Sequence, residues 1–527
     1  MSERSPLIPK APRDEPGFMT ALDMVLILPV LLSNVFVAAF ESTVAASTQS
    51  AIGTEFRATD NIAWLATSYL IVFVAIQPLY GRASELFGRT KVYLFSLTFF
   101  GTGCLGCGLS RNLGEMIATR AICGLGGGGL ISISQICIWD LLPERHRPLY
   151  QAVNNLFYGL GGAIGASLGG LFVDTIGWRW GYLTPVPLSV ISILVFLLRV
   201  RPKLALVHRG RTALRLEDID YVGSALIFTA ITLLIVVINL GGDEIPWNSY
   251  WIPVLIVGFT AATVAFVRHE KTFPKPVLLL DLVRSRGMVS HIGLNLFGSI
   301  AVVATLYSIP VYFQTVRLAT ASTASRRLLY PTLAAPVGSL LTGFFLHRHR
   351  QKVQWTLVTG ASFMFLGGLS MLGMTFGSSS QSEWYYGTCL VGVHLGMGLL
   401  FISSLIHVLA EAGPNHALAT SLIFLLRSVG SVIGIAGSQA VLQNTLLQQL
   451  HMRLTGPHAV TTIRRIRESV AYLHQLDPET QATVIACYTV AFRATFVFIS
   501  LAGGLTLLST LLGLQRAQPP KEDEEVI

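Results

Sequence analysis

Charged side chains are scarce in this sequence. Asp, Glu, Lys and Arg account for 12% of the 527 residues, 52% are apolar or aromatic, and the mean hydropathy is +0.61. Ordinary soluble domains carry about 25% charged residues, so this chain has too little charge to cover a surface that faces water. The shortage excludes a soluble globular protein and a disordered one, and it predicts a protein that crosses a membrane many times.

Cysteine is rare as well, with 6 residues that all fall inside apolar runs. So small a number excludes a secreted domain held together by disulfides. Cys104 and Cys107 have the spacing of a redox or zinc motif, but no second pair and no histidine lies near them in the sequence. We therefore assign them to packing and expect neither a metal nor a cofactor.

Long apolar runs predict the fold class. A helix needs about 20 apolar residues to cross about 30 Å of hydrocarbon, and lipid offers no hydrogen-bond partner to the backbone, so each such run is expected to be a helix. The expected fold is an all-α polytopic membrane protein with 14 transmembrane helices. These runs are 24–46, 62–81, 92–110, 113–138, 149–173, 181–199, 219–240, 249–267, 288–313, 324–346, 354–376, 384–410, 416–441 and 485–513.

Lys and Arg are divided unevenly between alternate loops. If the N-terminus is cytosolic, the cytosolic segments hold 24 of the 37 basic residues, the opposite segments hold 10, and 3 lie in the spans. Basic loops stay on the cytosolic side, so we expect both termini in the cytosol. The same bias accounts for the net charge of +9, and we expect no nucleic-acid partner.

The two ends of the chain and one loop carry further signals. The N-terminal residues lack the apolar core of a signal peptide, but Glu3, Leu7 and Ile8 match an acidic dileucine signal that a sorting adaptor would read. In the outer loop 442–484, apolar residues recur at helical spacing beside arginines, which predicts an amphipathic helix. We favour a solvated cap over a helix that lies in the lipid interface.

A turn rich in glycine and charge follows the second run. Its residues Gly81, Glu85, Gly88 and Arg89 place an acid four residues after one glycine and three before the next. This order resembles the signature between the second and third helices of the major facilitator superfamily, with Glu85 where that family usually has Asp. The resemblance implies that these residues take part in the conformational change.

The fourth run contains Arg120, followed by the glycine-rich stretch 124–129. A dinucleotide-binding loop is excluded because no strand precedes the glycines, which are better suited to close helix contact. An arginine inside a membrane costs about 2.5–3.5 kcal/mol on insertion scales, so it predicts a functional site. The pattern resembles the fourth-helix motif of the same superfamily.

In the fifth run, Gly161, Gly165 and Gly169 are spaced by four and share one helix face. They resemble the antiporter motif of drug/proton antiporters, although Ala166 stands where that motif has Pro. Glu41 resembles the first-helix acid of the 14-span branch of these antiporters, again in place of Asp. Together with the segment that begins at Trp64, it makes the chain most similar to fungal vacuolar basic amino acid transporters.

The resemblance implies two six-helix halves that rock about a central site. The implied segments are a cytosolic tail 1–23, a first half 24–199, loops and two linker helices 200–287, a second half 288–513 and a cytosolic tail 514–527. Spans one, four, nine and twelve would line the cavity.

Few polar groups lie on those four spans. At about 1.5 Å per residue, Glu41 and Arg120 are at similar depths on neighbouring helices, so we expect them to approach each other in the outer half of the cavity. The hypothesis is that Glu41 exchanges a proton against a cationic substrate, and the alternative is that it only pairs with Arg120 to hold two helices together. Asn295 and His394 are further candidates for proton or substrate binding, and we assign Arg427 to the scaffold or to gating.

The expected function is a proton-coupled antiporter, not an enzyme, that moves lysine, arginine or histidine into the vacuole by alternating access. Its expected form is a monomer. A multidrug exporter at the plasma membrane would share the same motifs, and a nutrient sensor that does not transport is a third possibility. Measured substrate flux and cellular location separate the three.

Overall fold

The computed structural model describes residues 21–56, 63–142, 146–202, 220–240, 249–273, 286–319, 321–349, 352–377, 382–412, 416–454, 459–468 and 470–514. The dileucine candidates Glu3, Leu7 and Ile8 lie outside these residues. Within them the chain is helical with no strand, and 14 helices are long and apolar enough to cross a membrane. The predicted fold class is confirmed.

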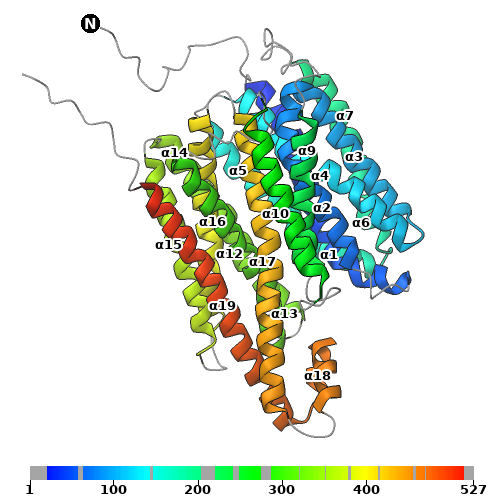
Figure 1. Ribbon diagram of the computed structural model, residues 1–527, viewed down its shortest axis with the longest axis vertical. Helices are drawn as coiled ribbons and strands as arrows, with labels where there is room; N and C mark the ends of the chain where they lie inside the picture. The colour runs from blue at the N-terminus through cyan, green and yellow to red at the C-terminus, as the bar shows by residue number, and fades with distance from the viewer. Residues whose placement is uncertain are drawn as a thin grey trace, which may run out of the picture.

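The helices fall into two groups of crossings joined by a helical pair (Figure 1). The first group comprises α1 (Ala21–Glu55), α2 (Ala63–Leu86), α3 (Arg89–Leu109), α4 (Leu113–Leu141), α5 (Arg147–Asp174) and a sixth crossing built from α6 (Arg179–Leu183), α7 (Pro185–Val195) and η3 (Phe196–Val200). The pair is α9 (Tyr221–Leu240) and α10 (Trp251–Glu270). The second group comprises α12 (Arg286–Thr315), α13 (Ala321–Arg327), α14 (Leu329–Arg348), α15 (Val353–Met374), α16 (Glu383–Ala412), α17 (His416–Arg453) and α19 (Pro478–Leu514).

Each group packs mostly within itself. In the first group α1 packs on α5, and α4 packs on both α2 and α3; in the second, α12 packs on α17 and α19, and α16 packs on α14 and α15. The two groups, called the first and second half below, meet where α5 packs on α14 and where α2 packs on α17. The α9–α10 pair covers the second of these seams, because α9 packs on both α2 and α17.

Glycines set the closest contacts inside each half. A side chain at Gly161 or Gly165 of α5 would meet the backbone carbonyl oxygen of Phe36 or Phe40 on α1. Gly430 and Gly434 of α17 lie in the same way against the carbonyls of α12. The spacing of four therefore brings two helix backbones together in each half.

The last two long helices extend beyond the apolar runs 416–441 and 485–513 that predicted them. α17 continues to Arg453 and α19 begins at Pro478, so only the middle of the predicted loop 442–484 lies between them. That part holds α18 (Ala459–Glu468) and the 3-10 helix η7 (Val470–Gln475). Ile463 and Ile466 are buried in the core of the second half, so α18 packs as a cap beside the end of α17 (Figure 1).

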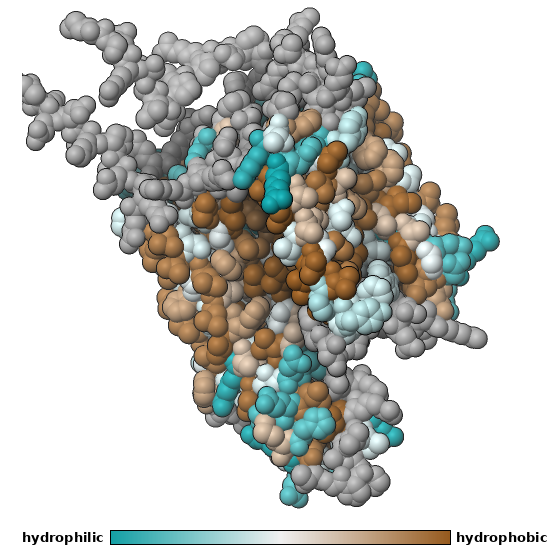
Figure 2. All heavy atoms as spheres, in the orientation of Figure 1, coloured by the Kyte–Doolittle hydropathy of each residue, from teal (hydrophilic) through white to brown (hydrophobic). Residues whose placement is uncertain are grey.

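The outer faces of the helices are apolar. Large side chains such as Leu198 and Trp355 are 72% and 70% exposed, and Figure 2 shows hydrophobic residues over the middle of the bundle with hydrophilic ones gathered at its ends. A soluble monomer rarely exposes so much contiguous apolar surface. Lipid is the medium that this surface fits.

The bundle has two ends. We call the end where α1 begins the proximal end, and the end that carries α18 the distal end.

Candidate functional site

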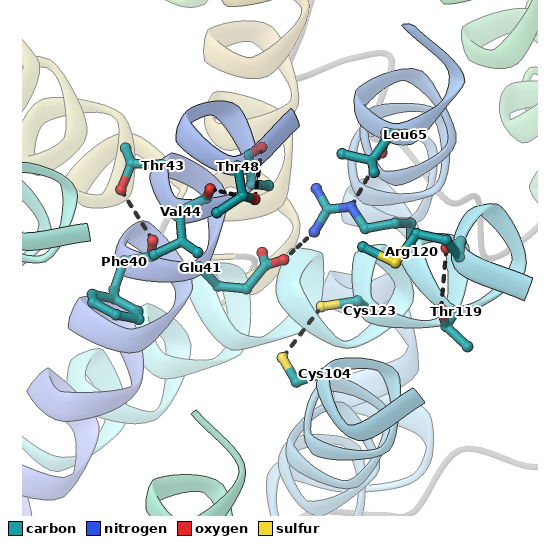
Figure 3. A network of polar contacts seen from close by, with 12 residues as sticks. Phe40, Glu41, Thr43, Val44, Thr48, Leu65, Cys104, Thr119, Arg120 and Cys123 are labelled. Carbon is teal, nitrogen blue, oxygen red and sulfur yellow. Dashed lines mark hydrogen bonds and ion pairs between the residues drawn. The ribbon is translucent and has the colours of Figure 1, made fainter. Parts of the chain in front are cut away.

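A buried ion pair joins α1 to α4 in the first half (Figure 3). Arg120 Nη1 donates a hydrogen bond to Glu41 Oε1, and Arg120 Nε donates to the backbone oxygen of Leu65 on α2 at 3.1 Å. The guanidinium carbon lies 4.3 Å from the centroid of the Tyr69 ring. Carboxylate, carbonyl and aromatic face together compensate a charge that lipid alone would not tolerate.

The pair is closed off from solvent. Glu41 is 0% and Arg120 2% exposed, and Tyr182 of α6 contributes a second aromatic ring 6.0 Å from the guanidinium. The pair thus lies among α1, α2, α4 and α6, inside the first half. The expected approach of Glu41 and Arg120 is present, and in this conformation the pair is buried beside the rings of Tyr69 and Tyr182.

One oxygen of the carboxylate is left without a partner. Glu41 Oε2 is buried and accepts no N–H or O–H hydrogen bond in the described part of the chain, whereas Oε1 is bonded to Arg120; the Cys123 thiol is the neutral donor beside this carboxylate. A buried acceptor without a donor is costly, but the same atom is where a proton binds without breaking any existing hydrogen bond. The geometry therefore favours a carboxyl group that can accept a proton.

The thiols beside this pair are a packing contact. Cys104 of α3 and Cys123 of α4 lie with their Sγ atoms 3.6 Å apart (Figure 3), and both are buried. Cys107, the other member of the sequence motif, does not make this contact. Among the described residues no three metal-binding side chains gather in one place.

Asn295 lies at the centre of a hydrogen-bond network in the second half. Its Nδ2 donates to Ser404 Oγ at 2.7 Å and to the His291 oxygen at 2.8 Å, while its Oδ1 accepts from Arg427 Nε at 2.7 Å. His291 also contacts Ser404 Oγ, 3.0 Å from its Nδ1. Asn295 was a candidate from the sequence, but its hydrogen bond with Arg427 could not be predicted because the two residues are 132 positions apart.

His394 stands apart from this network. It lies in α16, is 2% exposed, and neither ring nitrogen has a hydrogen-bond partner within the described residues. The structure therefore brings Glu41 together with Arg120, but it leaves Asn295 and His394 away from that pair.

The glycine- and charge-rich turn lies at the proximal end. Gly88 has φ +85°, a backbone conformation that glycine adopts without strain. Glu85 pairs with Arg82 at 3.0 Å, whereas Arg89 reaches Asp140 at the end of α4, also at 3.0 Å. A side chain at Gly81 would collide with Ser421 of α17, so this turn is in close contact with the second half.

In the described part of the chain, hydrogen bonds join the two halves at the proximal end and farther into the bundle. His416 Nε2 bonds to Asp140 Oδ1 at 2.9 Å at the proximal end, and Ser428–Gln77 at 3.0 Å and Asn155–Ser339 at 3.2 Å lie deeper. The Trp139 side chain is buried in a cluster formed mostly by residues of the second half. The proximal end is therefore closed in this conformation.

A polar contact at the distal end joins α1 to α6. Glu55 accepts a hydrogen bond from Trp178 Nε1 at 2.5 Å and pairs with Arg179 at 2.8 Å. Partial burial raises the pKa of Glu55, but the bond from Trp178 and the charge of Arg179 outweigh it and hold that pKa below its ordinary value. The sequence alone does not indicate this contact, because its two sides are 123 positions apart.

Comparison with known proteins gives consistent matches. The model of the Major Facilitator Superfamily matches residues 30–435. The chain is 34% identical to "Multidrug resistance protein fnx1" of Schizosaccharomyces pombe over 90% of either chain. It is also 34% identical to "Vacuolar basic amino acid transporter 2" of Saccharomyces cerevisiae, over 86% of this chain and 98% of that one. The solved structure of the proton:xylose symporter XylE shares the fold, with a TM-score of 0.60, 15% identity, and coverage of 95% of this chain and 97% of that one.

Proposed function

Because this chain belongs to the Major Facilitator Superfamily, whose members are transporters rather than enzymes, we propose that it is a proton-coupled antiporter of basic amino acids. It exchanges lysine, arginine or histidine against protons by alternating access, and so loads them into the vacuole. The relative from Saccharomyces cerevisiae supports the substrate class, since it is named as a vacuolar basic amino acid transporter and it aligns over 98% of its length.

The observation that carries the proposal is the buried Glu41–Arg120 pair with the unpartnered Oε2 of Glu41. A proton on Oε2 neutralises the carboxylate, so its attraction for Arg120 falls and α1 is released from α4. When the proton leaves, the ion pair forms again, because a lone buried charge is much more costly than a pair. One carboxyl group thereby couples proton binding to the packing of α1.

The energy available fits this role. Each pH unit across a membrane supplies about 1.4 kcal/mol per proton, and each 100 mV supplies about 2.3 kcal/mol per charge moved. An acidic vacuole therefore drives a cation inward as protons leave. The proximal end, which faces the cytosol in this proposal, is closed in the described conformation by His416 and Asp140. The distal end then faces the lumen, and Glu41 takes its proton from that side when the aromatic side chains around the buried pair move apart.

The proposed function also includes an orientation in the membrane, an oligomeric state and a sorting signal. Both termini lie in the cytosol, in keeping with the distribution of Lys and Arg along the sequence, and the chain works as a monomer. The tail residues Glu3, Leu7 and Ile8 are read by a sorting adaptor that directs the protein to the vacuolar membrane.

A second candidate is the export of drugs, which the match to a multidrug resistance protein favours. The two functions are separated by microscopy of a tagged chain and by uptake into vacuolar vesicles. Basic amino acid transport predicts a vacuolar signal and accumulation of labelled lysine that needs a pH gradient. A plasma-membrane signal, with movement of a lipophilic cationic dye and no lysine uptake, would support drug export instead.

A further inference from the structure

Arg427 lies on α17 between the face that packs on α12 and the face that meets the first half, and it is nearer to α12. Gly430 and Gly434 pack against α12 on one side of this helix, and Ser428 bonds to Gln77 of α2 on another. At 100° per residue, Arg427 falls on the arc between these two contacts. It is about 11 residues from the start of α17 at His416, or roughly 16 Å along the helix axis, which places it near the middle of the membrane.

Three contacts hold the guanidinium group in one orientation. Its Nε donates to Asn295 Oδ1 at 2.7 Å, and its Nη2 donates to the backbone oxygen of Phe401 at 2.8 Å. Its carbon lies 4.2 Å from the centroid of the Phe401 ring. Asn295 is fixed in turn by Ser404, so the arginine is positioned before any ligand arrives.

The positive charge of Arg427 lacks an ion-pair partner. Arg120, the other arginine deep in the bundle, has Glu41, whereas no carboxylate in the described part of the chain pairs with Arg427. Charged groups inside a membrane are almost always paired or face a functional site. The guanidinium also keeps N–H donors beyond the two that are used, in the forked geometry that matches a carboxylate.

We infer that Arg427 binds the α-carboxylate of the transported amino acid. This inference rests on the proposed function, and it assigns to the second half a site that receives the anionic end of the substrate. It accounts for Asn295 as a positioning residue that orients Arg427. It also predicts that the transporter requires a carboxylate in its cargo and discriminates against cations that lack one.

The test compares two probes that differ in this group. Lysine and cadaverine have the same amine chain, but cadaverine has no carboxylate. Binding of each is measured on the purified full-length protein. We expect the natural protein to bind lysine at least about tenfold more tightly than cadaverine, since a charge-assisted hydrogen bond is worth that much. In Arg427→Gln this preference should disappear through weaker lysine binding, with cadaverine binding unchanged, and Arg427→Lys should restore part of it.

A matched control is Arg493→Gln. Arg493 of α19 also bonds to a backbone oxygen, that of Thr375 at 3.3 Å, and lies over the Phe376 ring at 4.3 Å, but it sits at the far end of α15. The variant Arg493→Gln should therefore still bind lysine more tightly than cadaverine. A melting temperature measured for each variant shows that it is folded; if Arg427→Gln does not fold, Asn295→Ala, which frees the guanidinium, should reduce the preference.

Three other outcomes would count against the proposals, and they fall on different parts of them. If folded Arg427→Gln binds lysine as tightly as the natural protein, the carboxylate site is wrong while the proposed function stands. If the natural protein binds cadaverine as well as lysine, the site is equally overturned. If it binds neither, the proposed function itself fails, and the assignment of Arg427 fails with it.

Discussion

Glu41 and Arg120 are 79 positions apart in the sequence, yet they form one buried ion pair that joins α1 to α4. The same two helices are held to different neighbours by other means, α1 to α5 by glycine packing and α4 to the second half through Asp140. A change of charge at Glu41 therefore acts on the ion pair that joins α1 to α4, while glycine packing on α5 and the polar contacts of Asn34 and Glu55 keep α1 in the bundle.

Removing one member of the pair should cost more than removing both. Arg120→Gln leaves the Glu41 carboxylate buried without its partner, and we expect a loss of about 3–5 kcal/mol in the free energy of unfolding. The double variant Glu41→Gln with Arg120→Gln should recover part of that loss. Thermal unfolding of the purified variants measures it, and a double variant no more stable than Arg120→Gln would contradict the pairing.

The glycine row on α5 should tolerate side chains only away from α1. In Gly165→Ala the new methyl group meets the Phe40 carbonyl oxygen, so we expect a destabilisation of about 1–3 kcal/mol together with slower transport. Gly170→Ala is the control, because nothing lies within 4 Å of a methyl group there. Equal melting temperatures and uptake rates for the two variants would rule out the packing role.

His416 should favour the conformation with the proximal end closed. His416→Ala removes a hydrogen bond to Asp140 worth about 1 kcal/mol, so the ratio of open to closed molecules should rise about fivefold. Spin labels at the exposed positions Lys91 and Arg348, one in each half, would report a larger population of long distances. An unchanged distance distribution would show that this contact does not control closure.

The Glu55 contact should confer stability that depends on pH. The pKa of this carboxyl is lower in the folded protein than its ordinary value of 4.5, so the stabilisation is full above 4.5 and is lost as the pH falls through the folded-state pKa. We expect Glu55→Gln to melt below the natural protein at pH 7 and to match it in stronger acid. A difference in melting temperature that stays constant over this range would refute the ion pair.

The sequence predicted the membrane crossings well because apolar length alone determines them. It did not predict that α17 continues past the thirteenth apolar run to Arg453, through a stretch in which polar residues alternate with the buried Leu442, Leu446 and Leu450. A helix that leaves the lipid needs only backbone hydrogen bonds and packing, and hydropathy does not report either. The buried Ile463 and Ile466 did carry a signal for the cap, through their helical spacing.

The site was predictable only in part. The cost of charge in lipid singled out Glu41 and Arg120, but no local pattern shows that aromatic side chains close the pair off from water. The hydrogen bond between Asp140 and His416 joins residues 276 positions apart, and the one between Asn295 and Arg427 joins residues 132 positions apart. Such contacts depend on how the halves are packed, which spacing within one helix does not determine.

The role of Glu41 is tested most directly by separating proton-driven accumulation from simple exchange. Glu41→Gln keeps the shape of the side chain but cannot bind and release a proton, and Glu55→Gln is the matched control at the end of the same helix. In vesicles that hold the purified protein, we expect Glu41→Gln to lose lysine accumulation driven by a pH gradient and to retain lysine-for-lysine exchange, while Glu55→Gln retains both. Accumulation by Glu41→Gln at the natural rate would contradict the proposal that this carboxyl carries the proton.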